Sequence, residues 1–237
     1  AFSGASEAEA DLAAKIAGVV RDDLASIGIF TAPDSAAIST FSADIAALPG
    51  WMDWTGARVG ALVVGKTIIG ADDSLTVQFR LYDIAARKQV VGSQYRLPAT
   101  DQWRRAAHKV ADEVLVALVG GKGGFDSRIA YVADTGATPS LGVVTADAAE
   151  QETLLPNAAG LEAPRVAPDN SGLVYSANAP VPGKPNQAQR TTILYDLASG
   201  QRQPLTTQSQ PNADTRYSAD SASLVYSRKQ GANTDIY

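Results

Sequence analysis

A pattern of twelve residues occurs twice in the C-terminal half of the chain and constrains its architecture more than any other feature. Residues 165–176 and, 51 residues further along, residues 216–227 share an arginine, an aspartate and the run Leu-Val-Tyr-Ser in the same positions. Residues 128–132 form a looser, earlier copy. Several short strands repeated about every 45–50 residues are the sequence signature of a β-propeller, whose blades are small sheets.

The same repeat indicates how much of a propeller the sequence contains. In each copy an aspartate-containing turn precedes the Leu-Val-Tyr-Ser strand, and the third copy stops at residues 233–237, inside its third strand. A single blade cannot bury both of its faces, so neighbouring blades must stack, and two blades with a fragment cannot close a ring. We therefore expect a truncated chain that holds the first two blades and part of a third.

A glycine-rich joint separates these repeats from a different N-terminal half. Four glycines fall within residues 120–124, which is too flexible a run for a packed element. Three of the 12 prolines precede this joint and the other nine follow it. The sequence predicts an α/β domain over residues 1–120, a linker over 121–127 and an all-β partial propeller over 128–237.

Hydrophobic periodicity predicts the elements of the N-terminal domain. Apolar residues recur every three or four positions over 6–28 and again over 100–119, which is the spacing of amphipathic helices. Apolar and polar residues alternate over 75–84, as in a half-buried strand. Two further strands are predicted over 61–69 and 89–97, and a short helix over 51–57.

Composition and charge argue against several classes of function. The net charge is −5, with 20 Lys and Arg against 25 Asp and Glu, so nucleic acid is not an expected partner. The chain has no cysteine, which excludes disulfides, thiolate metal sites and cysteine nucleophiles. No apolar run approaches the ~20 residues that span a bilayer, so no direct membrane insertion is expected. No pattern in the sequence requires a cofactor.

One motif matches a nucleotide-binding pattern in residue types and spacing but not in structural context. Residues 60–67, Gly-Ala-Leu-Val-Val-Gly-Lys-Thr, have the spacing of a phosphate loop. A phosphate loop follows a strand and opens a helix whose N-terminus faces the phosphates. Here the four middle residues are themselves a β-type apolar run, and the residues after Thr67 lead into a turn. We therefore interpret the motif as an ordinary buried strand.

The side chains that could carry catalysis do not form a recognisable set. His108 is the only histidine and has no partners at relay or metal-ligand spacing, so we interpret it as a packed or capping residue. The adjacent acid pairs at 22–23 and 72–73 cannot face one another on a strand or a helix. Asp169 and Asp220 fit Asx-type turns that precede strands. No catalytic or metal-binding residue is predicted.

Two tryptophans leave two interpretations open. Trp51 and Trp54 lie three residues apart in the predicted short helix. Aromatic residues at that spacing usually pack a helix onto a sheet. An exposed hot spot for a partner protein is the alternative.

Four stretches carry a resemblance to a known family. They are residues 61–66 (Ala-Leu-Val-Val-Gly-Lys), 102–108 (Gln-Trp-Arg-Arg-Ala-Ala-His), 112–114 (Asp-Glu-Val) and 124–132 (Gly-Phe-Asp-Ser-Arg-Ile-Ala-Tyr-Val). Together with the propeller-like repeats they resemble the TolB family, the periplasmic component of the Tol–Pal system. The likeness covers essentially the whole chain, and it is most specific between Trp103 and Val132, where the last helix leads into the first blade.

This resemblance implies a location, partners and a role. Members of the family have a six-bladed propeller that docks the peptidoglycan-associated lipoprotein Pal, and an N-terminal tail that engages TolA. The system serves outer-membrane integrity and constriction at cell division, and some colicins exploit the same protein during bacteriocin import. The resemblance therefore implies a non-enzymatic adaptor in the periplasm. We expect the chain to begin after the tail, near Phe2, and to lack about four blades.

The resemblance also implies that loops between successive blades face Pal. In this chain those loops are residues 157–162 and 208–214, which are polar and rich in Gly, Ala or Pro. Plain solvent loops are the alternative interpretation of both segments. The candidate residues for Pal binding are Asn157, Gly160, Glu162, Gln210, Asn212 and Asp214.

A second class of function stays open at this point. Blades of similar sequence gate the hydrolase domain of prolyl oligopeptidases. That class needs a Ser/Asp/His domain, and the chain has neither a G-x-S-x-G elbow nor a suitable histidine. The alternative function is therefore the propeller domain of a prolyl-oligopeptidase-like hydrolase whose catalytic domain is missing.

Overall fold

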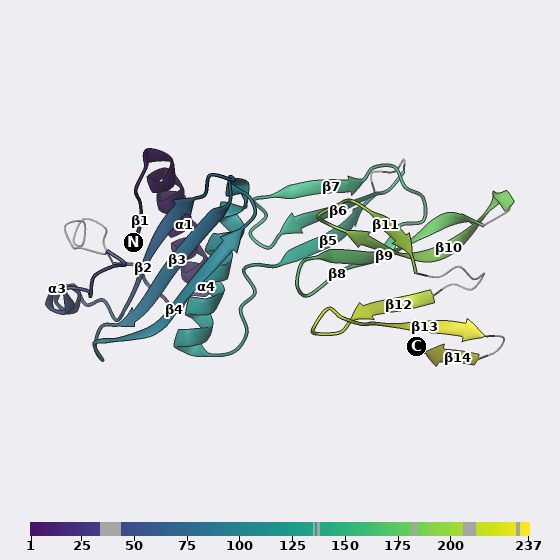
Figure 1. Cartoon of the computed structure of the whole chain (residues 1–237). Helices are drawn as coiled ribbons and strands as arrows, with labels where there is room; N and C mark the ends of the chain where they lie inside the picture. Colours follow the sequence, from purple (N-terminus) through teal and green to yellow (C-terminus); the bar gives the residue numbers. More distant parts are fainter. Residues whose placement is uncertain (34–43, 135, 137, 182–183, 206–211, 231–232) are drawn as a thin grey trace. The chain divides into compact units, whose positions relative to one another are not determined.

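The chain folds into two compact units. A computed structural model describes residues 1–33, 44–134, 136, 138–181, 184–205, 212–230 and 233–237. Unit 1 is Ala1–Asp126 and unit 2 is Ser127–Tyr237. Figure 1 shows unit 1 in purple to teal and unit 2 in green to yellow.

Unit 1 is built on a four-stranded sheet in the order β1-β2-β3-β4. β1 pairs in parallel with β2, whereas β2, β3 and β4 form two successive antiparallel pairs. The three long strands agree with the three strands expected from the sequence, whereas β1 was not expected. The strands are β1 (Phe2–Gly4), β2 (Ala61–Ile69), β3 (Leu75–Asp83) and β4 (Lys88–Leu97).

Two long helices, α1 (Glu7–Ser26) and α4 (Trp103–Val119), cover one face of this sheet (Figure 1). Val77 and Phe79 of β3 point to the helices and are almost fully buried against Ile16 and Val110. The single turn η1 (Thr100–Gln102) leads into α4. The short helix α3 (Trp51–Gly56) packs on a second core with residues of the opposite sheet face. The expected α/β fold of the N-terminal half is confirmed.

Local hydrogen bonds determine where α1 begins. The Ser6 Oγ accepts from the Glu9 N–H (3.3 Å), and the Glu9 Oε2 accepts from the Ser6 N–H (2.9 Å), which together form a capping box. The Glu9 Oε1 also accepts from the N–H of Ile69, at the end of β2 (2.9 Å). A Cβ on Gly4 would lie 2.3 Å from the Glu9 carbonyl carbon, so this close approach requires glycine. The start of the helix is thereby tied to the sheet.

The glycine-rich joint ends in contacts with α4. The Asp112 carboxylate accepts from the N–H groups of Gly124 (2.6 Å), Phe125 (2.8 Å) and Asp126 (3.0 Å). The Phe125 side chain packs against the core of unit 1. A Cβ on Gly123 would lie 2.4 Å from side-chain atoms of Asp112, so glycine permits this closure. The second part of the expected linker therefore packs on unit 1, while the domain boundaries themselves remain a prediction.

Unit 2 consists of three antiparallel sheets, which we call blades 1, 2 and 3. Their strand orders are β5-β6-β7, β11-β10-β9-β8 and β12-β13-β14. This agrees with the two blades and part of a third expected from the repeats. Blade 1 contains β5 (Arg128–Ala133), β6 (Ser140–Thr145) and β7 (Gln151–Leu155); blade 2 contains β8 (Glu162–Val166), β9 (Gly172–Val181), β10 (Lys184–Asp196) and β11 (Arg202–Pro204); blade 3 contains β12 (Asn212–Tyr217), β13 (Leu224–Gln230) and β14 (Asn233–Ile236).

The repeated aspartates hold equivalent turns in blades 2 and 3. The Asp169 Oδ1 accepts from the Ser171 N–H (2.9 Å), and the Asp220 Oδ1 accepts from the Ala222 N–H (3.1 Å). The backbone N–H of Asp169 also donates to the Ser221 Oγ (3.1 Å), which links the two turns. The interpretation of both aspartates as Asx-type turn residues is confirmed.

Candidate functional site

The phosphate-loop-like motif at residues 60–67 lies in a regular strand. β2 pairs with β3 along its whole length, with Lys66 opposite Gln78. Thr67 is completely buried, and the residues after it continue the strand to Ile69. No helix begins at the motif, so the interpretation as an ordinary strand is confirmed.

His108 is part of the contact between the two long helices. It is buried, and its Nδ1 lies 2.7 Å from the Oδ2 of Asp23 on α1, which is also buried. Asp22, next in sequence to Asp23, is exposed and pairs with Arg21. The expectation of a packed histidine is confirmed, and the structure adds its acidic partner.

The second acid pair belongs to turns. The Asp72 Oδ1 accepts from the Ser74 hydroxyl (2.6 Å) and the Ser74 N–H (3.2 Å), and these bonds hold the pKa of Asp72 below its ordinary value. The Asp73 Oδ1 accepts from the Thr100 hydroxyl (2.9 Å). Within the described ranges, no three His, Cys, Asp or Glu side chains gather in a way that could hold a metal ion.

Both tryptophans of α3 face the interior of unit 1. Trp54 is 3% exposed. The Trp51 ring packs edge-on against the ring of Tyr82, with centroids 5.7 Å apart. The interpretation of these residues as packing of a helix on a sheet is therefore confirmed over that of an exposed hot spot.

The loop from β7 to β8 joins blade 1 to blade 2 and contains the first three candidate residues. Its backbone is fixed by bonds from the Ala158 N–H to the Pro139 carbonyl (2.9 Å) and from the Asn178 N–H to the Ala159 carbonyl (3.3 Å). Leu161, at its end, is buried in a core that blades 1 and 2 share. The loop therefore makes backbone hydrogen bonds to both blades.

Asn157 and Gly160 have left-handed backbone conformations in this loop, with φ of 52° and 70°. Asparagine tolerates this region and glycine adopts it without strain. The Asn157 side chain is exposed. A Cβ on Gly160 would lie 2.6 Å from the Asn178 amide, so Gly160 allows this amide to lie against the loop. The role of Gly160 seen here is therefore one of close packing.

Glu162 begins β8 and forms an ion pair with Arg190 of β10. The hydrogen bond from Arg190 lowers the pKa of Glu162. Arg190 is the cross-strand partner of Asn178 on β9. These contacts join the loop to two strands of blade 2. We call the set Asn157, Gly160, Glu162, Asn178 and Arg190 the β7–β8 surface.

The second expected loop differs from the sequence-based expectation. Gln210 lies outside the described residues. Asn212 and Asp214 are in β12 and not in a loop, because the strand extends to pair Asn212 with Arg228 and Ala213 with Ser227 of β13. Among the candidates that the structure describes, those of the first loop lie close to one another.

Two residues of the β7–β8 surface were not expected from the sequence. Asn178 and Arg190 belong to the long hairpin of β9 and β10, far along the chain from the loop. Only the register of that hairpin places them beside Gly160 and Glu162. The sequence around residue 187 is polar, which was the available signal for an exposed surface. Polarity alone did not indicate which loop would lie beside Asn178 and Arg190.

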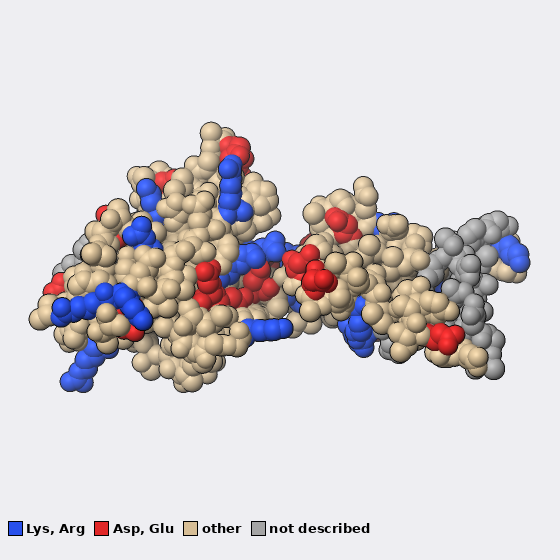
Figure 2. All heavy atoms as spheres, turned by 60° about the horizontal axis from the view of Figure 1, so that its bottom comes forward, with Lys and Arg blue, Asp and Glu red and all other residues tan. Residues whose placement is uncertain are grey.

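Charged groups of both signs are interspersed on each unit. On the face shown in Figure 2, neither unit gathers its Lys and Arg side chains into one extended basic patch. In the part of the chain that the structure describes, no helix has both the length and the apolar character needed to cross a bilayer.

Comparison with known proteins identifies the family. A family model described as the TolB amino-terminal domain matches residues 1–90. The Tol-Pal system protein TolB of Roseobacter denitrificans is 35% identical over 177 residues, which cover 71% of this chain and 39% of the relative. That of Jannaschia sp. strain CCS1 is 33% identical over 204 residues, which cover 82% of this chain and 43% of the relative.

A solved structure agrees with these matches. The crystal structure of TolB from Acinetobacter baumannii is similar to the whole chain, with a TM-score of 0.64 and 25% sequence identity, and the match covers 55% of that structure. The chain spans about two fifths of the length of the curated relatives it matches. The resemblance noted in the sequence is therefore confirmed. The chain belongs to the TolB family.

Proposed function

We propose that the protein is a non-enzymatic periplasmic adaptor of the Tol–Pal system. In this proposal its propeller loops bind the lipoprotein Pal and an N-terminal tail of the protein provides the link to TolA, in support of outer-membrane integrity and cell division. Colicins would use the same protein as a route of import. The observation that carries the proposal is the match along the chain to relatives named as Tol-Pal system protein TolB.

The β7–β8 surface supports a role in protein binding. Asn157, Glu162 and Asn178 are exposed polar side chains on a loop and two strands that both blades hold in place. Amides and ion-paired groups on a preformed backbone can accept and donate hydrogen bonds to a partner at little cost in conformational entropy. Loops positioned by a rigid scaffold commonly serve recognition.

The environment of the single histidine supports an adaptor and not an enzyme. His108 is buried between α1 and α4 and is engaged with Asp23, where a substrate has no access. A general base must lie within hydrogen-bond reach of the proton that it removes. The contacts of His108 are therefore those of a structural group.

Calorimetry with Pal from the same organism tests the proposal on the protein as expressed from its gene. The variant Asn157→Gly with Glu162→Gln removes one amide and one negative charge from the β7–β8 surface, and glycine preserves the left-handed backbone at position 157. We expect Pal binding to weaken by about 1–3 kcal/mol if these residues are central to the contact. The unfolding free energy should change by no more than about 0.5 kcal/mol, as is usual for surface positions.

Glu152→Gln is the matched control, because Glu152 is also exposed in unit 2 but lies on β7, outside the β7–β8 surface. It should leave the affinity for Pal unchanged. Equal affinity of wild type and the double variant would remove this surface from the contact, and absence of binding by wild type would contradict the adaptor role.

The first residues of β12 are tested in the same titration. Asn212→Ala with Asp214→Ala changes the two candidate residues that lie in β12. We propose that they contribute to Pal binding in addition to the β7–β8 surface, and we expect the variant to lose about 1–3 kcal/mol in affinity for Pal. A large loss of stability with this pair would assign the residues to the strand instead of the contact.

A further inference from the structure

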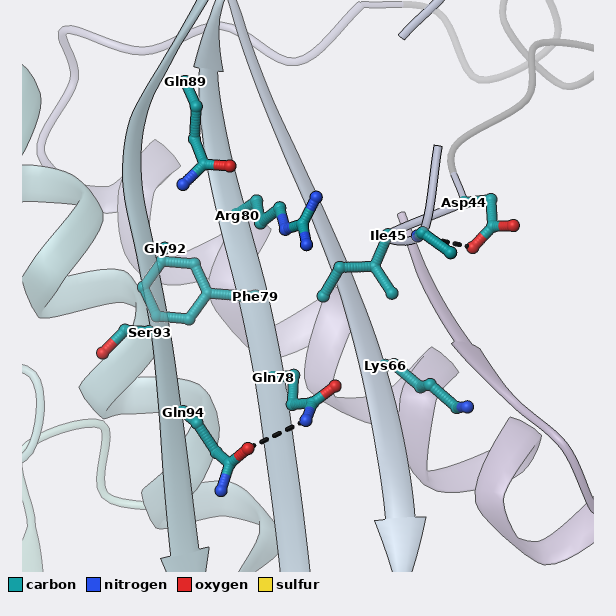
Figure 3. Close-up of a pocket in the computed structure, with 11 residues that line it drawn as sticks. Asp44, Ile45, Lys66, Gln78, Phe79, Arg80, Gln89, Gly92, Ser93 and Gln94 are labelled. Atoms are coloured by element: carbon teal, nitrogen blue, oxygen red, sulfur yellow. Dashed lines mark hydrogen bonds between the residues drawn. The ribbon is translucent and has the colours of Figure 1, made fainter. Parts of the chain in front are cut away.

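A hollow on unit 1 has no part in the proposed function. It has a volume of about 620 Å³ and opens on the sheet face away from α1 and α4. Such a volume falls within the range of about 300–1,000 Å³ that is typical of ligand sites. Figure 3 shows its lining from three strands and the residues before α3, with Ile45 as a buried wall.

Two cations rise from neighbouring strands into this hollow. Lys66 of β2 is opposite Gln78 of β3, and Arg80 is two residues further along β3 on the same face. Diagonal neighbours of this kind have their side chains about 7–8 Å apart at the backbone end. Both are half-buried, and in the described ranges neither the Lys66 nor the Arg80 side chain makes a hydrogen bond or an ion pair. Two like charges therefore share one face, and no described acidic side chain is paired with either of them.

The acidic residue at the rim does not neutralise them. The Asp44 Oδ1 accepts from the Ala46 N–H (2.9 Å) inside its own turn. No ion pair joins Asp44 to Lys66 or Arg80 among the residues that the structure describes. Asp44 is exposed and lies at the far side of Ile45 from Arg80 in Figure 3. Among the acidic side chains that the structure describes, none therefore neutralises Lys66 or Arg80.

Side-chain amides complete the lining beside the cations. The Gln78 Nε2 donates to the Gln94 Oε1 (2.8 Å), which fixes the two amides next to one another (Figure 3). This leaves the Gln78 oxygen as an acceptor and the Gln94 nitrogen as a donor. Gly92 stands opposite Arg80 on β4, and the Gln89 amide lies against it, since a Cβ on Gly92 would be 2.5 Å from the Gln89 Nε2. The donor and acceptor pair matches the groups of a peptide bond.

We propose that this hollow binds a short acidic peptide segment of a partner, with Lys66 and Arg80 each holding a carboxylate. The planar guanidinium of Arg80 suits two parallel hydrogen bonds to a carboxylate, and Lys66 adds a second positive charge. The amides of Gln78 and Gln94 bind the adjoining peptide group. A free inorganic anion would fill only a small part of 620 Å³ and would leave these amides unused.

Fluorescence anisotropy with two labelled probes tests the proposal on the whole chain at low salt. The probes are acetylated, amidated tetraglutamate and the matching tetraglutamine. Wild type should bind tetraglutamate at least about tenfold more tightly than tetraglutamine, a difference that corresponds to one charged contact. Lys66→Gln with Arg80→Gln should abolish this preference. Arg80→Lys should lose several-fold in affinity, because lysine keeps the charge but not the paired hydrogen bonds.

Lys15→Gln is the matched control, because it removes one positive charge from the exposed surface of α1. It should leave both affinities unchanged, and thermal melts should show that all variants are folded. If the double variant does not fold, Lys66→Gln alone and Arg80→Lys provide the comparison.

Three results would overturn the proposal: no binding of tetraglutamate by wild type, equal binding of the two probes, or an unchanged preference in the variants of Lys66 and Arg80. Displacement of tetraglutamate by an equal concentration of inorganic phosphate would assign the hollow to small anions and would also overturn it. The test is independent of Pal binding, because all its variants lie in unit 1 and those of the β7–β8 surface lie in unit 2.

Discussion

The two units bury their sheets in different ways. In unit 1, helices α1 and α4 cover one sheet face, and Phe79 beneath them is 1% exposed. In unit 2, sheets cover one another, and Leu141 of blade 1 and Leu173 of blade 2 are fully buried in a shared core. In blade 3, Val225 is 48% and Ile236 is 80% exposed.

This difference teaches where stability comes from in each unit. A sheet covered by helices of its own unit completes its burial locally, because the amphipathic helices carry a matching apolar stripe. A blade has no helix, so its burial depends on the blade that is packed on each face. Unit 1 should therefore resist local opening evenly, and unit 2 should resist it least in blade 3.

Hydrogen exchange should show the largest contrast. β3 (Leu75–Asp83) and β13 (Leu224–Gln230) are strands of similar length at the centres of their sheets. We expect the amides of β13 to exchange more than about a thousandfold faster than those of β3, because local opening ranges from almost no free-energy cost to that of global unfolding. Mass-spectrometric exchange on the whole chain measures both. Equally slow exchange in a monomer would contradict the comparison, whereas protection of β13 that rises with concentration would indicate self-association.

Truncation of a core side chain should have the next largest effect. Phe79→Ala removes a ring that stacks on Tyr95 with centroids 6.3 Å apart, and it should lower the unfolding free energy by about 3–5 kcal/mol. All 3 tryptophans, at positions 51, 54 and 103, lie in unit 1, so their fluorescence in a urea titration reports this unit. Val225→Ala, at a half-exposed site of blade 3, is the control; calorimetric melts, which record both units, should show a cost of less than about 0.5 kcal/mol. Similar losses for both changes would remove the contrast between helix-covered and open sheets.

The Asp112 side chain should contribute less to the unfolding free energy than a core side chain, but more than an ordinary acidic side chain on the surface. Asp112→Ala removes the acceptor for three backbone N–H groups at the end of unit 1. We expect the unfolding free energy to fall by about 2 kcal/mol, since each hydrogen bond to a charged group is worth about 1.5–3 kcal/mol before the structure relaxes. Limited proteolysis should cut residues 120–126 faster in the variant. Asp11→Ala is the control, because Asp11 makes only an exposed ion pair with Lys15. Unchanged cleavage of the joint would show that Asp112 does not hold it.

Features with local causes were predictable from the sequence. The alternation along β3 indicates a strand because the side chains of a strand point to opposite faces in turn. Asp169 and Asp220 indicate turns because their carboxylates bond to the backbone two residues further on. Gly120 and Gly121 adopt positive φ, as the joint requires. In each case the cause and its effect lie within a few residues of one another.

Features that depend on register or tertiary packing were not predictable. The extension of β12 to include Asn212 follows from pairing with Arg228, which no local pattern indicates. The contact of His108 with Asp23 joins residues that are 85 positions apart. The hollow with Lys66 and Arg80 requires the register of two strands and the cover provided by Ile45, none of which composition reveals. The candidate surfaces were therefore found only in part from the sequence.

The smallest expected effect is a pH dependence at the start of α1. The N–H groups of Ile69 and Ser6 donate to Glu9, and they lower its pKa from 4.5 to about 2. Because the pKa is lower in the folded chain, this contribution to stability is fully present above about pH 4.5 and is lost as the pH falls toward 2.

Thermal melts of wild type and Glu9→Gln from neutral pH down to about pH 2 measure this contribution. The neutral amide of the variant keeps one acceptor oxygen where the carboxylate has two, so the melting temperature should be lower than that of wild type near neutral pH. The difference should narrow as the pH falls below 4.5, because wild type then loses the same charge. Glu7→Gln, on the same exposed first turn, should give a small difference that does not follow this window. If the difference for Glu9→Gln stays constant down to the lowest pH, the bond between α1 and the end of β2 acts through packing and not through the charge of its carboxylate.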